Sequence, residues 1–281
     1  METCYRHPSR ETGVSCSNCG RPICPDCMRV ASVGFQCPEC VAEGAKTVRE
    51  PRTTFGGRIT DESSRVTQVV LAVCVGLYAV GLVVGERELQ LRLGNIAGPV
   101  LLREDGPVEG VAAGQYYRLL TAAFLHANLV HLVVNMLALA QLGPGLEQRL
   151  GRVRFLGLYL LSALGGSTLS FVISDPGALG VGASGAIYGL FGAYFVVERR
   201  LGGDTRPIVT LILVNLAISF AVPIIDWRAH LGGLVTGAAV AVLLAYVPKG
   251  PRRALWQLLG AVLLAGLVAG AIVLRTSALA G

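Results

Sequence analysis

The chain has 281 residues, of which 53% are hydrophobic and only 15% are charged, and its mean hydropathy is +0.59. This composition is typical of a membrane protein and argues against a disordered or collagen-like chain. The net charge of +6 is modest and does not point to a nucleic-acid partner.

The first 40 residues differ from the rest because they hold seven of the eight cysteines. With one histidine these cysteines form four ligand pairs: Cys4 and His7, Cys16 and Cys19, Cys24 and Cys27, Cys37 and Cys40. Two intervening residues let both side chains of a pair reach one tetrahedral ion, so eight ligands predict two closed, structural zinc sites. A disulfide framework is the alternative, but this head lacks the apolar segment of a secretion signal and is expected to stay in the cytoplasm.

The head resembles a B-box-type zinc finger over nearly its whole length. The resemblance implies interleaved pairing, with Cys4, His7, Cys24 and Cys27 at one ion and Cys16, Cys19, Cys37 and Cys40 at the other. Pairing of neighbouring motifs is the alternative, and the sequence does not decide between the two. So short a segment buries little apolar surface, and metal binding is expected to supply most of its folding energy. The head could bind a cytoplasmic protein or serve only as a folding cap.

The rest of the chain is predicted to be an all-α, polytopic membrane domain. Residues 1–42 would be the zinc-binding domain, 43–65 a polar linker, 66–247 a six-helix core, and 248–281 an extra C-terminal transmembrane helix. Seven apolar stretches near the length of about 20 residues needed to cross a bilayer are predicted as spans: Val66–Val84, Leu119–Leu142, Val153–Ile173, Ala183–Val197, Pro207–Val222, Ala229–Val247 and Leu255–Leu274. Most basic residues precede the first span or lie in every second loop, which predicts a cytoplasmic N-terminus and an external C-terminus.

Strongly polar side chains are costly at membrane depth, so each one is a candidate functional residue. His126, His131 and Asn135 fall in the second predicted span, and His131 and Asn135 are four residues apart on one helical face. Two imidazoles could suit a metal ion. No carboxylate accompanies them in the membrane, however, and the sequence contains no His-Glu-x-x-His motif, which argues against a metalloenzyme.

Ser184 begins the fourth predicted span and His230 lies near the start of the sixth. The serine alone could be a helix cap or a packing contact. Both spans have two glycines four residues apart: Gly185 and Gly189 on the fourth, Gly233 and Gly237 on the sixth. Such small faces allow backbone contact between helices, which would bring the serine to the histidine. Because histidine is the usual base that activates a serine hydroxyl, the pair predicts a catalytic dyad.

An acyl-transfer centre also needs donors for the oxyanion, and Asn135, His131 and the Ser184 N–H could supply them. Asp226 lies near His230 in the sequence but outside the span, and it is not assigned a role.

With these motifs in this order, residues 65–247 resemble the rhomboid intramembrane serine proteases. The resemblance implies Ser184 as nucleophile and His230 as base. It also implies His131 and Asn135 as oxyanion residues, and His126 as the additional second-span histidine of the family.

The resemblance further implies that Tyr188 packs on the catalytic imidazole and that the loop Gly85–Arg118 lies partly in the membrane. The end of that loop, Tyr116-Tyr117-Arg118, departs from the Trp-Arg pair of the family, which affects loop anchoring at most. The implied activity is hydrolysis of peptide bonds in or near transmembrane helices of membrane proteins, without a catalytic cofactor. The high ratio of arginine to lysine and the compact seven-span design suit a bacterial plasma membrane. Small residues lining the approach to Ser184 predict small residues at the cut.

Two other functions remain as alternatives. A catalytically silent, rhomboid-like scaffold would bind membrane helices, but it would have no need to keep both Ser184 and His230. A small transporter would be expected to show paired repeats or charged residues in the middle of its spans, and the sequence shows neither.

Overall fold

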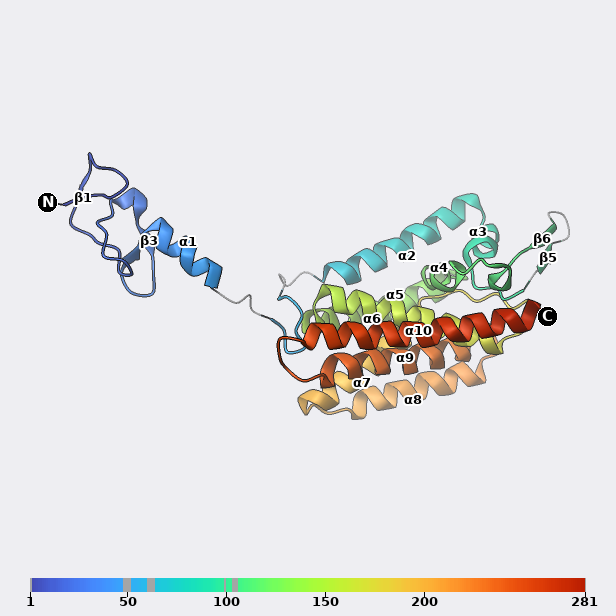
Figure 1. Ribbon diagram of the computed structural model, residues 1–281. Helices are drawn as coiled ribbons and strands as arrows, with labels where there is room; N and C mark the ends of the chain where they lie inside the picture. Colours follow the sequence, from blue (N-terminus) through green and yellow to red (C-terminus); the bar gives the residue numbers. More distant parts are fainter. Residues whose placement is uncertain (1, 48–51, 60–63, 99, 103–105, 281) are drawn as a thin grey trace. The chain divides into compact units, whose positions relative to one another are not determined.

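The computed structural model describes residues 2–47, 52–59, 64–98, 100–102 and 106–280. The chain forms two compact units, Met1–Pro51 and Arg52–Gly281. The first unit is built mainly of turns, and the second is almost entirely helical (Figure 1).

The first unit consists of two short hairpins and one helix. Strands β1 (Glu2–Thr3) and β2 (Glu11–Thr12) pair antiparallel, as do β3 (Arg29–Val30) and β4 (Phe35–Gln36), with a 3-10 turn η1 (Pro25–Cys27) and the helix α1 (Pro38–Thr47). Its buried hydrophobic residues are six of the cysteines together with Ile23. So small an apolar core contributes little to stability, which agrees with the expectation that folding depends on metal.

The described part of the second unit contains seven apolar helices and several short elements. The helices are α2 (Arg65–Val84), α5 (Leu129–Leu150), α6 (Arg152–Ile173), α7 (Ser184–Leu201), α8 (Arg206–Ala221), α9 (Trp227–Tyr246) and α10 (Arg253–Ala280). Between α2 and α5 lie α3 (Glu86–Leu93), the hairpin β5 (Val100–Leu102) and β6 (Gly106–Val108), the 3-10 turns η2 (Val111–Ala113) and η3 (Ala122–Phe124), and α4 (Arg118–Thr121).

Among the described residues, five helices are long and apolar enough to cross a membrane: α2, α5, α6, α9 and α10. The helix α8 is apolar but shorter, with 16 residues. The helix α7 has 18 residues, and its last turn contains Glu198, Arg199 and Arg200 before Leu201. Each predicted span thus has an apolar helix, and the chain is a multi-pass membrane protein.

The bounds predicted for the second span were wrong at both ends, because α5 runs from Leu129 to Leu150 rather than from Leu119 to Leu142. The reason is Asn128, whose side-chain oxygen accepts a hydrogen bond from the His131 N–H at 2.9 Å and caps the helix. The apolar residues before this cap form α4, η3 and an irregular segment. His126 therefore precedes the helix, and is not on it as predicted.

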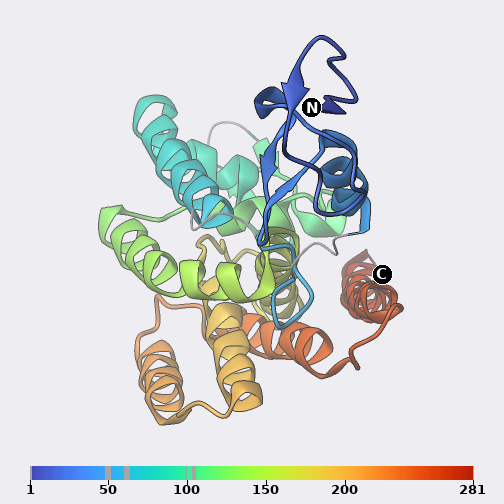
Figure 2. The same ribbon diagram turned by 90° about the vertical axis from the view of Figure 1, so that its left-hand side faces the viewer.

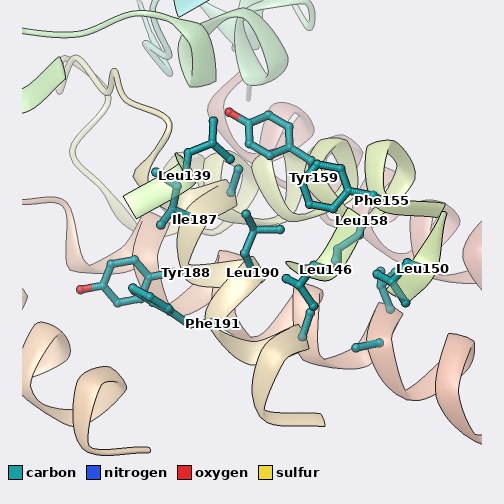
Figure 3. Packing of buried hydrophobic residues seen from close by; sticks show 14 of the residues in the cluster. Leu139, Leu146, Leu150, Phe155, Leu158, Tyr159, Ile187, Tyr188, Leu190 and Phe191 are labelled. Carbon is teal, nitrogen blue, oxygen red and sulfur yellow. The ribbon is translucent and has the colours of Figure 1, made fainter. Parts of the chain in front are cut away.

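The buried core of the second unit is built from α5, α6, α7 and α9, with a smaller share from α2, and Figure 3 shows the part between α5, α6 and α7. Leu139 and Leu146 on α5 pack with Leu158 and Tyr159 on α6 and with Leu190 on α7. Helix α10 lies at one edge of this unit (red in Figure 2), where most of its residues are exposed.

Residues 52–59 fall within the predicted linker, yet the structure packs them into the second unit. Phe55 is 1% exposed and belongs to the main core. A Cβ placed on Gly57 would lie 2.1 Å from the Leu150 carbonyl oxygen, so this turn is in backbone contact with the end of α5. The domain boundaries predicted from the sequence otherwise remain a prediction.

Candidate active site and metal centres

Helices α7 and α9 are in backbone contact, as the glycine spacing predicts. A Cβ on Gly233 would lie 1.8 Å from the Gly185 carbonyl oxygen, and a Cβ on Gly237 would lie 2.2 Å from the Gly189 oxygen. No side chain larger than hydrogen fits at either position. Because Ser184 is the first residue of α7 and His230 lies in the first turn of α9, the contact brings both residues to the same end of the two helices.

Ser184 is half-buried at the beginning of α7, where the first backbone N–H groups have no partner within the helix. The preceding turn depends on Gly182, whose φ of +136° favours glycine. A Cβ on Gly182 would lie 2.7 Å from His131 Cε1 and 3.6 Å from Ser184 Oγ. The side chains of His131 and Ser184 therefore flank the same small space.

His230 is 7% exposed, and two other helices hold its ring. The Tyr188 ring on α7 stacks on it with a centroid distance of 4.0 Å and an interplanar angle of 12°. Its Nδ1 atom lies 2.7 Å from Ser219 Oγ on α8, and the same hydroxyl lies 2.9 Å from the Tyr188 hydroxyl. The stack is the arrangement that the resemblance implies for Tyr188, whereas nothing in the sequence pattern singled out Ser219.

The three polar residues of the predicted second span lie together. The Asn135 amide donates to the His131 carbonyl oxygen at 2.8 Å, which leaves its second N–H available. The rings of His126 and His131 meet edge to face at 5.2 Å. His126 is 3% exposed, and neither of its ring nitrogens has a hydrogen-bond partner among the described residues.

The Asp226 carboxylate accepts hydrogen bonds from groups other than His230. It accepts from the backbone N–H groups of Arg228 and Ala229, which caps α9, and from the Ser170 hydroxyl at 2.5 Å. Within the described part of the chain, no hydrogen bond joins Ser184 Oγ to His230. Such bonds are often long in the absence of substrate and tighten when it binds.

The head contains two groups of four ligand atoms, and the atoms of each group lie within 4.8 Å of one another. The groups are Cys4, His7, Cys24 and Cys27, and Cys16, Cys19, Cys37 and Cys40, which is the interleaved arrangement. All eight cysteines of the chain are free. The cluster geometry thus favours metal sites over the disulfide alternative.

Distances within the groups fit a tetrahedral ion. Cys19 Sγ lies 3.8 Å from Cys37 Sγ, and His7 Nδ1 lies 3.3 Å from Cys24 Sγ and 3.4 Å from Cys27 Sγ. A tetrahedron with zinc–sulfur bonds of about 2.3 Å has edges of roughly 3.8 Å. A hydrogen bond from the Arg21 side chain lowers the pKa of the Cys19 thiol, which favours the thiolate that binds metal.

Comparison with known proteins agrees with this geometry. The model of the rhomboid domain matches residues 113–247, which contain α5 to α9 and all the candidate catalytic residues. The rhomboid-family protein YdcA of Bacillus subtilis (strain 168) is 39% identical over 149 residues, which cover 51% of this chain and 74% of YdcA. The chain belongs to the rhomboid family.

Two further relatives cover smaller parts of their own lengths. The rhomboid protease GluP of Bacillus subtilis (strain 168) is 40% identical over 169 residues, which cover 57% of this chain and 32% of GluP. The RHOMBOID-like protein 5 of Arabidopsis thaliana is 34% identical over 167 residues, covering 55% of this chain and 53% of that protein. The rhomboid chain described here therefore spans about a third of GluP and about half of the plant protein.

Proposed function

We propose that this rhomboid is an intramembrane serine endopeptidase in which Ser184 is the nucleophile and His230 the general base. The observation that supports this most is the contact between α7 and α9, which brings a half-buried serine and a buried histidine to one end of the core. The protease names of relatives agree with the proposal.

The proposed reaction uses the two residues in turn. As Ser184 Oγ attacks the scissile carbonyl carbon, its proton passes to Nε2 of His230. The imidazolium then protonates the leaving amine, which breaks the peptide bond and leaves an acyl group on Ser184. Water, deprotonated by His230, attacks this ester. The imidazolium then returns the proton to Ser184 Oγ as the bond from Oγ to the acyl carbon breaks, which releases the second product with a carboxyl end.

Negative charge develops on the carbonyl oxygen in both steps. The free Ser184 N–H at the start of α7, the His131 ring and the second Asn135 amide hydrogen are the proposed donors to this oxyanion. His131 lies beside Ser184 across Gly182, so its ring flanks the position where the oxyanion would form. His126 packs on His131 and would hold that ring in place.

The proposed substrates are membrane proteins with a transmembrane helix that unwinds near Ser184, because the hydrogen bonds of an intact helix shield its peptide bonds. The proposed setting is a bacterial plasma membrane with a cytoplasmic N-terminus, as the distribution of basic residues predicts. The proposed domains are a zinc-binding head, a linker, the six-helix protease core and one additional helix.

The two groups of ligands in the head would hold two zinc ions, which are structural because every site is filled by four protein ligands. Zinc would supply folding energy to a unit with little apolar core. A cytoplasmic protein that binds this head is the further role proposed for it.

A fluorophosphonate probe tests the proposal without a known substrate, because it labels activated serines. We expect wild-type protein in detergent to be labelled, and Ser184→Ala and His230→Ala to be unlabelled. Ser277→Ala is the matched control, because Ser277 is exposed on α10 far along the chain from the site. Absence of labelling in well-folded wild-type protein would favour the silent scaffold instead.

A further inference from the structure

Ser219 on α8 contacts His230 but has no role in the proposed reaction. It is 2% exposed, and it is one of two buried residues on that helix. Its hydroxyl oxygen has three polar neighbours: His230 Nδ1 at 2.7 Å, the Asn215 carbonyl oxygen at 2.7 Å and the Tyr188 hydroxyl at 2.9 Å.

The donors and acceptors of this cluster determine where its hydrogens lie. A serine hydroxyl has one hydrogen to donate and two lone pairs to accept with. The Asn215 carbonyl can only accept, so the Ser219 hydrogen must point to it for that contact to be a hydrogen bond. His230 Nδ1–H and the Tyr188 O–H then donate to the two lone pairs of Ser219. This is the one assignment in which all three short contacts are hydrogen bonds.

The opposite assignment leaves a repulsive contact. If the Ser219 hydroxyl donated to His230 Nδ1, its oxygen would face the Asn215 carbonyl oxygen at 2.7 Å with no hydrogen between them. An unpaired contact of this kind between buried polar atoms is unfavourable. The network therefore favours a hydrogen on Nδ1 of His230.

We propose that Ser219 is a positioning residue that fixes His230 in the tautomer with a hydrogen on Nδ1 and a free lone pair on Nε2. The inference rests on the proposed function, since only that tautomer can accept a proton from Ser184 through Nε2. After proton transfer, Ser219 continues to accept from Nδ1–H of the imidazolium. It thus takes a place at the histidine that a carboxylate takes in a catalytic triad, without contributing a charge.

The test compares Ser219→Ala with Ser219→Thr, which keeps a hydroxyl, and with Thr210→Ala, which removes an exposed hydroxyl from the same helix. We expect the rate of fluorophosphonate labelling to fall about 10- to 100-fold in Ser219→Ala, less than the roughly 10⁴-fold loss when a triad aspartate is replaced by its amide. Ser219→Thr should recover most of that loss, and Thr210→Ala should match wild type. Equal labelling of wild type and Ser219→Ala would overturn the proposal, as would an equal loss in the threonine variant.

A second readout reports the tautomer directly. In 15N-histidine NMR spectra of the full chain, His230, identified by its loss in His230→Ala, should show a protonated Nδ1 and an unprotonated Nε2. Ser219→Ala should move both signals toward a mixture of tautomers, which a purely structural role would not do. An unprotonated Nδ1 in wild type would refute the assignment. Because the spectra do not depend on reaction with the fluorophosphonate, they decide the role of Ser219 even if the proposed protease activity fails.

A separate observation is a cavity of about 570 Å³ at the end of the helices remote from Ser184. Arg154, in the first turn of α6, lines it, whereas Ser170 in the last turn of α6 contacts the cap of α9 near the active site. Ten residues line the cavity; four of them are basic and none is acidic. The basic residues are Arg52, Arg154, Lys249 and Arg253.

Three of these cations donate hydrogen bonds to neutral groups, and Arg52 donates to the Gly56 carbonyl oxygen at 3.3 Å. Arg154 donates twice to the Gln257 side-chain oxygen, at 2.9 and 3.0 Å, and Arg253 donates to the Thr54 carbonyl oxygen at 3.0 Å. The side chains of Arg154 and Arg253 come within 3.6 Å of where a Cβ on Gly56 would lie. Like charges so close repel one another, and a bound anion would offset that repulsion.

We infer that this cavity binds a phosphate group, because arginine pairs with phosphate through two parallel hydrogen bonds. Leu255 and Trp256 on α10 are exposed next to the cavity, and tryptophan is enriched at the level of lipid headgroups. The phosphate can come from an anionic phospholipid or from a soluble compound.

Thermal unfolding of the full chain in nanodiscs tests this inference and distinguishes the two sources. A rise in Tm when phosphatidylglycerol is added to phosphatidylcholine discs would support a lipid phosphate, and the same rise with inorganic phosphate in phosphatidylcholine alone would support a soluble one. The rise in Tm should disappear in the double variant that combines Arg52→Gln with Lys249→Gln. It should persist in Arg252→Gln, because Arg252 is exposed and does not line the cavity. No rise with either anion, or an equal rise in the double variant, would overturn the inference.

Discussion

The contact between α7 and α9 predicts that Gly233→Ala, although it adds only one methyl group, lowers both the stability of the protein and the reactivity of Ser184. A Cβ at this position would lie 1.8 Å from the Gly185 oxygen, whereas real Cβ atoms keep at least 3.0 Å, so the helices must separate by at least 1.2 Å. The obstructing atoms are backbone atoms and cannot rotate away. Such overpacking costs about 1–3 kcal/mol of stability. A misplacement of about 1 Å at reacting groups can cost roughly 100-fold in rate.

The assay is the rate of fluorophosphonate labelling together with thermal unfolding, both in the same detergent. Gly233→Ala should lower both, with the larger effect on labelling. Gly185→Ala, whose Cβ would lie 3.2 Å from the Ala229 oxygen, should have a milder effect on stability. Gly157→Ala on α6 is the control, because a Cβ there meets no atom within 4 Å. If Gly233→Ala labels and unfolds like wild type, the close approach of the two helices does not hold the site together.

Three further predictions concern other parts of the chain. Phe55→Ala should destabilise the second unit by up to about 3–5 kcal/mol, measured by thermal or denaturant unfolding, whereas Val153→Ala, at an 83% exposed position, should not. Metal analysis should find two zinc ions per chain, and Cys24→Ser should lose one of them. Sequential pairing of the motifs would give the same result, whereas a disulfide framework would not. Addition of a chelator should unfold the head, as measured by circular dichroism, without changing the labelling of Ser184. In a panel of transmembrane substrates that differ only at the cut, small residues should be cleaved fastest, and a preference for Phe or Leu would contradict the narrow approach to Ser184.

The helical fold and the close contact of α7 with α9 could be predicted because each depends on a pattern within a single helix. Apolar length indicates a span, and glycines four residues apart indicate a close helix contact wherever the partner helix lies. The interleaved ligand groups could be suggested only by resemblance, because the pairing of C-x-x-C motifs depends on the fold of the whole head.

Other features depend on contacts that no local pattern contains. The beginning of α5 is set by one side chain, Asn128, inside a continuous apolar stretch. Residues 52–59 look like a linker because they are polar, yet Phe55 makes them part of the core. Ser219 is a small, weakly polar residue of a kind that transmembrane helices often contain, and only the arrangement of α7, α8 and α9 gives it significance.

The supports of His230 differ in how firmly the protein holds them. Tyr188 lies on α7, which is buried along most of its length, so the stacking contact moves only with the core. Ser219 lies on α8, where Ile208 is the other buried residue, so few contacts fix that helix. A displacement of α8 would thus break the bond to Nδ1 while the stack with Tyr188 stays intact. The orientation of the imidazole is therefore fixed by the core, whereas its tautomer depends on the position of a lightly packed helix.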